Sequence, residues 1–381
     1  MPMPITRRTL AGALGAAAGA ALFDSRFGRA AALASVRRGM PGDVVQLNSN
    51  ENPYGPSAKA LAAASASGGV ANRYPDSLEE EVRGAIAKHH GVAIDRIVLG
   101  CGSSEILHMA DTAFTGPGKV AVAAEPTFEA VLAYARILNA EAVKVPLTVD
   151  FRHDLPKMAA ACNEKTGLVY VCNPNNPTGT IVTGDEIAAF VPKVPSTATI
   201  LVDEAYHHFV EDPRYRSAIG LIDTKPNLLV ARTFSKIYGM AGLRLGYAVG
   251  SEARIAEMAK HASWSDTNSM VLSAALASLA DPGHVPLQKK ALNDTRRWLV
   301  AEMTKQGRRT IPSETNFVMI DVGGDVAPII QAFGKKKILV GRKFPSLPNW
   351  LRISIGKPEE MQAFVAGLNE IVPAKKAVAA A

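Results

Sequence analysis

The sequence predicts an α/β fold, with a three-layer αβα large domain around a mainly parallel seven-stranded sheet and a smaller α+β C-terminal domain. Short apolar runs recur between residues 97 and 250, and several contain no alternation of polar and apolar residues, which suits strands buried on both faces. Amphipathic stretches lie between most of these runs, and strands that alternate with helices are typical of a parallel sheet. A length of 381 residues allows two domains.

The elements of the large domain follow from these two patterns. A first helix is predicted over residues 77–90, where apolar residues recur at helical spacing. The expected strands are Ile97–Gly100, Val120–Ala124, Ala142–Val145, Leu168–Cys172, Ile200–Asp203, Leu228–Thr233 and Leu245–Gly250. The expected helices between them include Glu105–Phe114, Phe128–Leu138 and Gly184–Val191.

The pattern changes after about residue 255, which indicates a second domain. Long helical stretches there lead into shorter apolar runs and a closing helix. We therefore expect an export signal over 1–34, an N-terminal arm over 35–72, a large domain over 73–255 and a small domain over 256–381. The expected elements of the small domain are Arg254–Ala262, Val271–Leu279, Pro286–Lys305 and Pro358–Ile371 as helices, and Phe317–Val322, Ile338–Val340 and Leu351–Ile355 as strands.

The N-terminal 34 residues have the features of an export signal. Arg7 and Arg8 precede the apolar run 11–23, and Ala32-Leu33-Ala34 supplies small residues for a cleavage site. The paired arginines resemble the twin-arginine signal, so we expect export to the periplasm, with a disordered extension on a cytoplasmic protein as the alternative. The apolar run is too short to span a bilayer, so no stable membrane anchor is expected.

Composition and charge exclude several classes of protein. Hydrophobic residues make up 48% and charged residues 20%, which is close to globular averages. The net charge of +7 is partly in the N-terminal segment and otherwise spread without basic blocks, so no nucleic-acid partner is expected. The three cysteines form neither a CxxC pair nor an even framework, so neither structural zinc nor disulfides are expected.

Polar segments follow several of the predicted strands, at the edge where open α/β sheets bind ligands. The strand ends lead into Gly100–Ser104, Asn173–Gly179, Asp203–Tyr206 and Thr233–Lys236, and Arg244 follows eight residues after Lys236. These segments bring a lysine, a carboxylate, a phenol, an amide, hydroxyls and an arginine to one edge. Asp203 and Glu204 with the nearby histidines are a possible metal cluster, but no HExxH spacing is present and no metal is expected.

This set of groups matches what pyridoxal 5'-phosphate requires. The aldehyde of that cofactor needs a lysine amine for a Schiff base, and its pyridine nitrogen needs an acidic partner to remain protonated. The ring hydroxyl needs hydrogen-bond donors, which a tyrosine and an asparagine supply. The phosphate needs hydroxyls, backbone N–H groups at a helix start and an arginine.

Three motifs in order, Asn-Pro-Thr-Gly, Asp-x-x-Tyr and Ser-Lys-x(7)-Arg, resemble those of the fold-type I pyridoxal-phosphate aminotransferases of class I/II. The resemblance runs from about Leu47 to the C-terminus. Within that class the chain is most similar to histidinol-phosphate aminotransferases, on the segments Asn48–Pro56, Arg73–Asp76 and Ala241–Gly246.

The resemblance implies a role for each residue of the cofactor site. Lys236 is expected to form the Schiff base and to move the proton between the substrate Cα and the cofactor, and Asp203 to pair with the pyridine nitrogen. Tyr206 and Asn176 are expected to bond the ring hydroxyl, and Phe128 to stack on the ring. The residues expected to hold the phosphate are Gly102, Ser103, Ser104, Thr233, Ser235 and Arg244.

The resemblance also implies substrate and partner contacts. Arg352 is expected to grip a substrate carboxylate or an equivalent anion in a bidentate fashion, with Arg342 and Asn52 as further substrate residues. Tyr54 is expected to reach the cofactor phosphate of a partner subunit, which implies a homodimer. The substrates implied are an amino-acid donor and a 2-oxo-acid acceptor.

Three departures from the histidinol-phosphate pattern leave the donor open between histidinol phosphate and an aromatic or other amino acid. They are the export signal, Phe128 where tyrosine is usual, and Gly341 inserted ahead of Arg342. A decarboxylase or lyase of the same fold is a second hypothesis, although Asn48–Pro56 favours the aminotransferase. A non-enzymatic cofactor-binding module is a third hypothesis, which the retained lysine disfavours.

Overall fold

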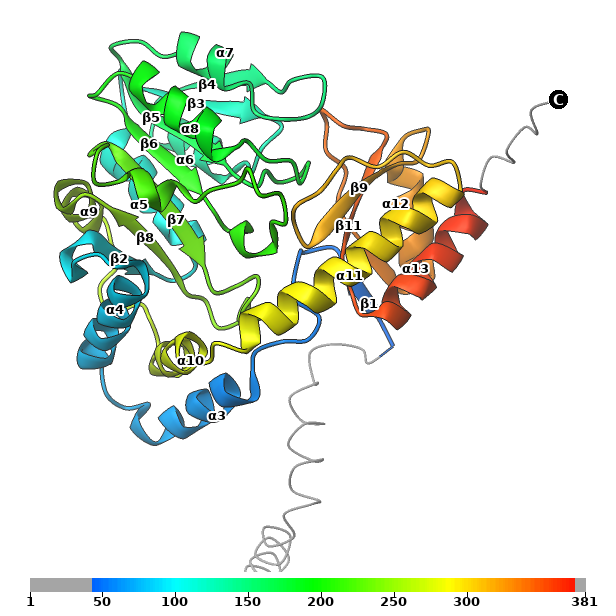
Figure 1. Cartoon of the computed structure of the whole chain (residues 1–381), viewed down its shortest axis with the longest axis horizontal. Coiled ribbons are helices and arrows are strands. Elements are labelled where there is room, and N and C mark those ends of the chain that lie inside the picture. The colour runs from blue at the N-terminus through cyan, green and yellow to red at the C-terminus, as the bar shows by residue number, and fades with distance from the viewer. Residues whose placement is uncertain (1–42, 374–381) are drawn as a thin grey trace, which may run out of the picture. The chain divides into compact units, whose positions relative to one another are not determined.

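The computed structural model describes residues 43–373 (Figure 1). The predicted export signal over residues 1–34 lies outside the described residues. The fold described below lies within the compact unit Gln46–Ala381. Within the described residues no helix is both long and apolar enough to cross a membrane.

A seven-stranded sheet forms the centre of this unit, in the order β2-β8-β7-β6-β5-β3-β4. Strand β8 is antiparallel to both of its neighbours, and the other neighbouring strands run parallel. The prediction of a mainly parallel seven-stranded sheet is confirmed. The strands are β2 (Ile97–Gly100), β3 (Val120–Glu125), β4 (Glu141–Pro146), β5 (Thr166–Cys172), β6 (Thr199–Asp203), β7 (Leu228–Thr233) and β8 (Gly246–Gly250).

Helices cover both faces of the sheet, because the strands bury alternate side chains on each side. On one face α5 (Ser103–Phe114), α6 (Ala130–Ile137) and α9 (Glu252–Ala259) contribute to a single apolar cluster with the strands. On the other, α7 (Leu155–Ala160) contacts β3, the short helix η5 (Ala218–Leu221) contacts β7, and α8 (Gly184–Phe190) packs against both α7 and η5. The result is a three-layer αβα arrangement.

A second set of elements follows the sheet in sequence. Helix α10 (Ser269–Leu279) packs against α3 (Ala58–Ala66) and α4 (Asp76–His90), which precede the sheet. The long helix α11 (His284–Lys305) then contacts α13 (Pro358–Ile371) and β9 (Phe317–Asp321), as Figure 1 shows. The remaining elements are the short helices η1 (Ser67–Val70), η2 (Ile94–Arg96), η3 (Val191–Lys193) and η4 (His207–Phe209), helix α12 (Val326–Lys335), and strands β1 (Val45–Leu47), β10 (Ile338–Val340) and β11 (Trp350–Ser354).

Two small two-stranded sheets contain the C-terminal strands, and one of them joins these strands to the N-terminal arm. Strand β11 pairs with β9, with Arg352 opposite Met319, and β10 lies beside β1. Helix α12 was not predicted, because Pro328 and Gly334 within its ten residues weaken the local helical signal. Its buried face, formed by Val326, Ile329 and Phe333, supplies the stability that the sequence pattern does not show.

One buried carboxyl group in this core has no polar partner. Asp111 of α5 is fully buried, and neither of its carboxylate oxygens has a hydrogen-bond partner. Burial raises the pKa of Asp111 from 3.8 to about 8. The folded state therefore binds a proton here more tightly than the unfolded chain does.

We expect the free energy of unfolding to fall as the pH rises from about 4 to about 8, because Asp111 must then ionise without a partner. Asp111→Asn should flatten this dependence and stabilise the protein by about 1–3 kcal/mol at the alkaline end. Urea unfolding across this pH range measures the effect, with the exposed Asp95→Asn as the matched control. An unchanged pH dependence in Asp111→Asn would contradict the argument.

Candidate active site

A cavity of about 260 Å³ opens where the polar segments that follow the strands meet the N-terminal arm and the C-terminal strands. The sequence-predicted residues that line it are Ser103, Ser104, Phe128, Asn176, Asp203, Tyr206, Ser235, Lys236, Arg244, Arg342 and Arg352. Four predicted residues do not line this cavity, namely Asn52, Tyr54, Gly102 and Thr233. Residues separated by more than 200 positions in sequence thus share one site.

Lys236 follows β7 and presents its amine to this cavity. Its Nζ lies 3.4 Å from the carbonyl oxygen of Ser49 and has no carboxylate partner among residues 43–373. Burial, followed by the positive charge of Arg352, lowers the pKa of Lys236 from 10.5 to about 8. A substantial fraction of the amine is therefore neutral near physiological pH, which is the form that attacks an aldehyde.

Asp203 ends β6 and supplies the buried carboxylate of the site. Its Oδ2 accepts a hydrogen bond of 2.8 Å from the Tyr170 hydroxyl, and its Oδ1 accepts one of 3.0 Å from the backbone N–H of Ala205. Burial raises the pKa of Asp203, whereas these hydrogen bonds act in the opposite direction. Asp203 forms no ion pair within the described residues, so a cationic ring nitrogen fits the requirement of this carboxylate.

The start of α5 and Arg244 form an anion cradle. Gly102 precedes the helix with φ +82°, and a Cβ atom at this position would lie 2.1 Å from Nη2 of Arg244. Glycine is thus required for the guanidinium to approach the backbone. Nη1 of Arg244 lies 3.4 Å from Oγ of Ser235, and Ser103 and Ser104 open the helix. Hydroxyls, free N–H groups and a guanidinium together suit a phosphate.

Tyr206, Asn176 and Arg352 are joined to the N-terminal arm by hydrogen bonds. The amide of Asn50 donates to the Tyr206 hydroxyl at 3.0 Å. Arg352 donates from Nη1 to Oδ1 of Asn176 at 2.7 Å and from Nη2 to the carbonyl of Asn48 at 2.9 Å. Burial raises the pKa of Tyr206, so its hydroxyl remains protonated and able to donate.

The four predicted residues outside the cavity make other contacts. Asn52 donates to the carbonyl of Ile237 at 2.9 Å, and Thr233 donates to the carbonyl of Leu245 at 3.3 Å. Tyr54 is 38% exposed in the single chain. Gly102 has no side chain, and the guanidinium of Arg244 occupies the space where a Cβ atom would be. The roles predicted for these residues in binding cofactor or substrate stay predictions.

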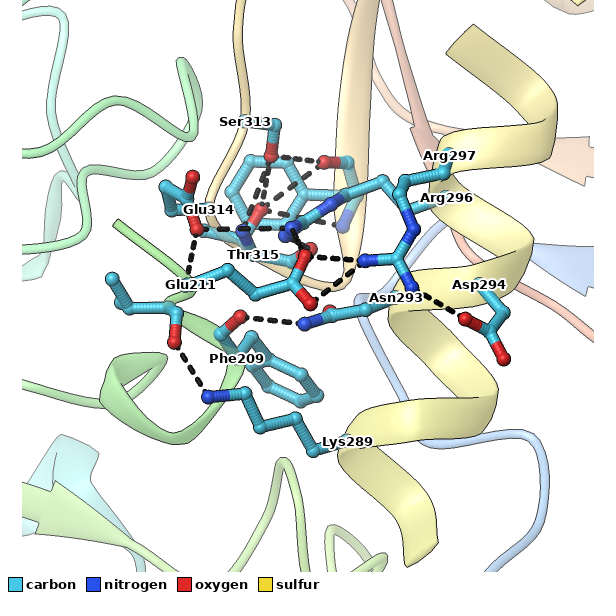
Figure 2. Close-up of polar contacts among 12 residues, drawn as sticks. Phe209, Glu211, Lys289, Asn293, Asp294, Arg296, Arg297, Ser313, Glu314 and Thr315 are labelled. Carbon is cyan, nitrogen blue, oxygen red and sulfur yellow. Dashed lines mark hydrogen bonds and ion pairs between the residues drawn. The ribbon is translucent and has the colours of Figure 1, made fainter. Parts of the chain in front are cut away.

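A polar network holds the chain segment that follows Tyr206 (Figure 2). Asn293 and Lys289 of α11 donate to the backbone carbonyls of Phe209 and Val210 at 2.9 and 2.6 Å. Arg296 of the same helix donates to the carbonyl of Thr315 at 2.9 Å. The long helix therefore fixes both the segment after Tyr206 and the approach to β9.

Several cavity residues were not predicted from the sequence. They include Ser49, Asn50, Thr127, Cys172 and Phe344. The motif Asn48–Pro56 identifies the first two as part of a functional segment, but not as cavity residues. No metal-binding group of three or more ligands occurs in residues 43–373.

Comparison with known proteins identifies the family. The model of the family described as aminotransferase class I and II matches residues 42–368. The chain therefore belongs to the class I and II aminotransferases. It is 37% identical over 328 residues to histidinol-phosphate aminotransferase of Symbiobacterium thermophilum, covering 86% of this chain and 90% of the relative. It is 34% identical to an aromatic amino acid aminotransferase of Cutibacterium acnes, covering 87% and 93%.

A solved structure with the same fold carries the expected cofactor. Histidinol-phosphate aminotransferase of Sinorhizobium meliloti, in complex with pyridoxal-5'-phosphate, matches with a TM-score of 0.81 and 27% identity, over 89% of this chain and 93% of that one. The amine, the unpaired buried carboxylate and the anion cradle in this chain fit that cofactor. The protein is a pyridoxal-phosphate-dependent aminotransferase, which confirms the predicted class, fold and cofactor.

We expect the rate at which cofactor-free protein binds pyridoxal phosphate to rise with pH and to level off above about 8, because Lys236 must be neutral to react. Arg352→Gln should move this midpoint to higher pH by removing a neighbouring positive charge. Growth of the visible Schiff-base band measures the rate, and the exposed Arg309→Gln is the control.

Lys236→Ala should fold and show no such band. A midpoint near the ordinary value of 10.5 in the unmodified chain would contradict the lowered lysine pKa.

Proposed function

We propose that this aminotransferase takes an amino donor with an anionic group that binds Arg352 and a side chain that is an imidazole or another aromatic ring, and passes the amino group to a 2-oxo acid. The observation that carries the proposal is that the guanidinium of Arg352 is buried and has no acidic partner among the described residues. Its Nε atom also has no hydrogen-bond partner among them. A buried, uncompensated guanidinium favours an anionic ligand.

The cavity walls support a ring-shaped side chain. Phe128, Tyr206 and Phe344 line the cavity together with Arg352. The relatives named above include both a histidinol-phosphate and an aromatic amino acid aminotransferase, which have a ring in their donors. Aromatic walls beside the unpaired Arg352 match a donor with one planar apolar end and one anionic end.

The proposed roles of the cofactor-site residues follow from their positions. Bound pyridoxal phosphate supplies an electron sink for the bonds to the substrate Cα. Lys236 holds and returns the proton, Asp203 keeps the ring nitrogen protonated, and Tyr206 with Asn176 donates to the ring hydroxyl. Phe128 stacks on the ring. The phosphate is held by the cradle of Ser103, Ser104, Ser235 and Arg244.

The decisive experiment is a half-reaction with single amino donors and no oxo acid. Loss of the visible Schiff-base band with histidinol phosphate, phenylalanine or tyrosine, and growth of the pyridoxamine band, are the expected result. Arg352→Ala should raise the KM of the reactive donor at least tenfold, because a bidentate charged contact contributes about 1.5–3 kcal/mol. The exposed Arg309→Ala is the control. A band that no donor converts would favour decarboxylase or lyase chemistry instead.

We further propose that the protein acts as a homodimer. Large apolar side chains are exposed on α3, on η1 and around the start of α10, and α10 packs against both α3 and η1. Trp264 is 97% exposed and Tyr74 is 82% exposed. An apolar surface of this kind favours a protein partner. A second copy would also supply Tyr54 to the neighbouring phosphate cradle, as the family resemblance implies. The apolar residues concerned are Leu61, Val70, Tyr74, Trp264 and Met270.

The double variant Leu61→Glu/Met270→Glu should weaken the dimer at least tenfold, because it places charges within this surface. Sedimentation equilibrium measures the association, and Ile137→Glu, at an exposed position of α6, is the control. Tyr54→Phe should weaken the affinity for the cofactor, because it removes the hydroxyl expected to reach the phosphate of the partner subunit. A wild-type chain that sediments as a monomer would overturn the proposal.

We also propose that residues 1–34 direct export through the twin-arginine pathway, as Arg7, Arg8, the apolar run and the small-residue site support. Replacing Arg7-Arg8 with Lys-Lys should leave the full-length chain in the cytoplasm. Cell fractionation measures this, and Arg26→Lys, outside the pair, is the control. A wild-type chain found only in the cytoplasm would refute the signal.

A further inference from the structure

Arg342 lies beside Arg352 because of the glycine that precedes it. The backbone N–H of Gly341 donates to the carbonyl of Arg352 at 2.9 Å. A Cβ atom on Gly341 would lie 2.6 Å from the same carbonyl oxygen, so a larger residue would displace the segment. The inserted glycine thus holds the end of β10 against β11 and brings a second guanidinium to the cavity wall.

The two arginines differ in how their charge is compensated. Arg352 is buried and has no acidic partner among the described residues, whereas Arg342 donates from Nη2 to Oε1 of Glu129 at 2.7 Å. Nη1 of Arg342 donates to the carbonyl of Lys343 at 3.1 Å. Glu129 comes from the large domain, directly after Phe128 of the cavity wall. Of these two arginines, Arg342 is thus already paired with a carboxylate.

Phe344 lies close to both of these guanidinium groups. The Arg342 Cζ atom lies 4.2 Å from the centre of the Phe344 ring, and the Arg352 Cζ atom lies 5.2 Å from it. Phe344 is only 4% exposed and packs with Ile311, Met319 and Leu347. Its ring is therefore a fixed aromatic wall of the cavity, and the cation stacked on it is held in place.

From this arrangement we infer that Glu129 and Phe344 determine the donor class, because they occupy Arg342 and leave Arg352 as the one arginine of this pair that can bind an anionic group of the donor. The preferred donor then carries one carboxylate and an uncharged aromatic side chain. A donor with a second carboxylate, or with a dianionic phosphate, must compete with Glu129 for Arg342 and approach a negative charge. This inference rests on the proposed function and narrows its substrate class to aromatic amino acids.

Binding of unreactive acids tests the inference without turnover. In the holoenzyme, 3-phenylpropionate offers one carboxylate and a ring, and succinate offers two carboxylates. We expect the wild type to bind 3-phenylpropionate more tightly, as followed by the change in the cofactor absorption spectrum. Glu129→Gln should lower the dissociation constant of succinate about fivefold and change that of 3-phenylpropionate by less than twofold. The expected effect is modest because the ion pair between Glu129 and Arg342 is partly exposed.

Two further variants complete the design. Glu125→Gln is the matched control, because Glu125 lies on the same rim and pairs with Lys144 and Ser346 without lining the cavity. It should change neither affinity by more than twofold. Phe344→Leu keeps an apolar side chain in the packed position but removes the aromatic ring. It should weaken the binding of 3-phenylpropionate at least fivefold.

The kinetic counterpart compares kcat/KM for phenylalanine, aspartate and histidinol phosphate in the same variants. Glu129→Gln should raise kcat/KM for aspartate and for histidinol phosphate relative to kcat/KM for phenylalanine. An unchanged preference in both assays would overturn the inference, as would a wild type that favours succinate. If no donor reacts, the proposed function fails, and the binding assay still decides whether Glu129 controls anion selection.

Discussion

The site depends on holding charged groups out of water without pairing them with one another. Lys236, Asp203 and Arg352 all line one cavity, and each forms hydrogen bonds with neutral groups. Lys236 contacts the carbonyl of Ser49, and Asp203 contacts the hydroxyl of Tyr170. Arg352 contacts the amide oxygen of Asn176 and the carbonyl of Asn48. If these charges formed ion pairs with one another, the amine would be held protonated and the guanidinium would not be free for a substrate. Neutral hydrogen bonds fix the geometry and leave the charges available to the cofactor and to the donor.

The N-terminal arm supplies much of this neutral support, so it belongs functionally to the site. Asn50 donates to Tyr206, while its own backbone N–H donates to Oγ of Ser354 at 2.8 Å. Asn316, just before β9, donates to the carbonyl of Asn50 at 3.0 Å. One short stretch of backbone is therefore fixed to the central sheet and to the C-terminal strands together. The network around α11 in Figure 2 fixes the other end of the Tyr206 segment, so that two independent attachments orient the phenol.

The sequence predicted the fold well because the buried strands are continuous apolar runs, and all seven strands of the central sheet are where these runs lie. It also predicted the cavity residues that directly follow strands, since the carboxyl ends of parallel strands meet at one edge. The residues that it did not reveal take their place from long-range folding. Tyr170 reads as an ordinary core residue of β5, and only the pairing of β5 with β6 brings its hydroxyl to Asp203. Glu129 reads as a polar helix-start residue, and its pairing with Arg342 requires both domains.

Three buried carboxyl groups show why burial alone does not define a functional group. Glu204 is the neighbour of Asp203, yet it pairs with Arg232 at 2.8 Å and both partners are buried, so its charge is already compensated. Asp111 is buried without any partner, but it lies in an apolar cluster at the sheet face and lines none of the cavity described here. The negative charge of Asp203 is not balanced by an ion pair within the described residues. In addition, Asp203 lines the cavity that also contains the amine of Lys236. Function at this edge of the sheet follows from that combination, because an unpaired charge there meets space for a ligand that can neutralise it.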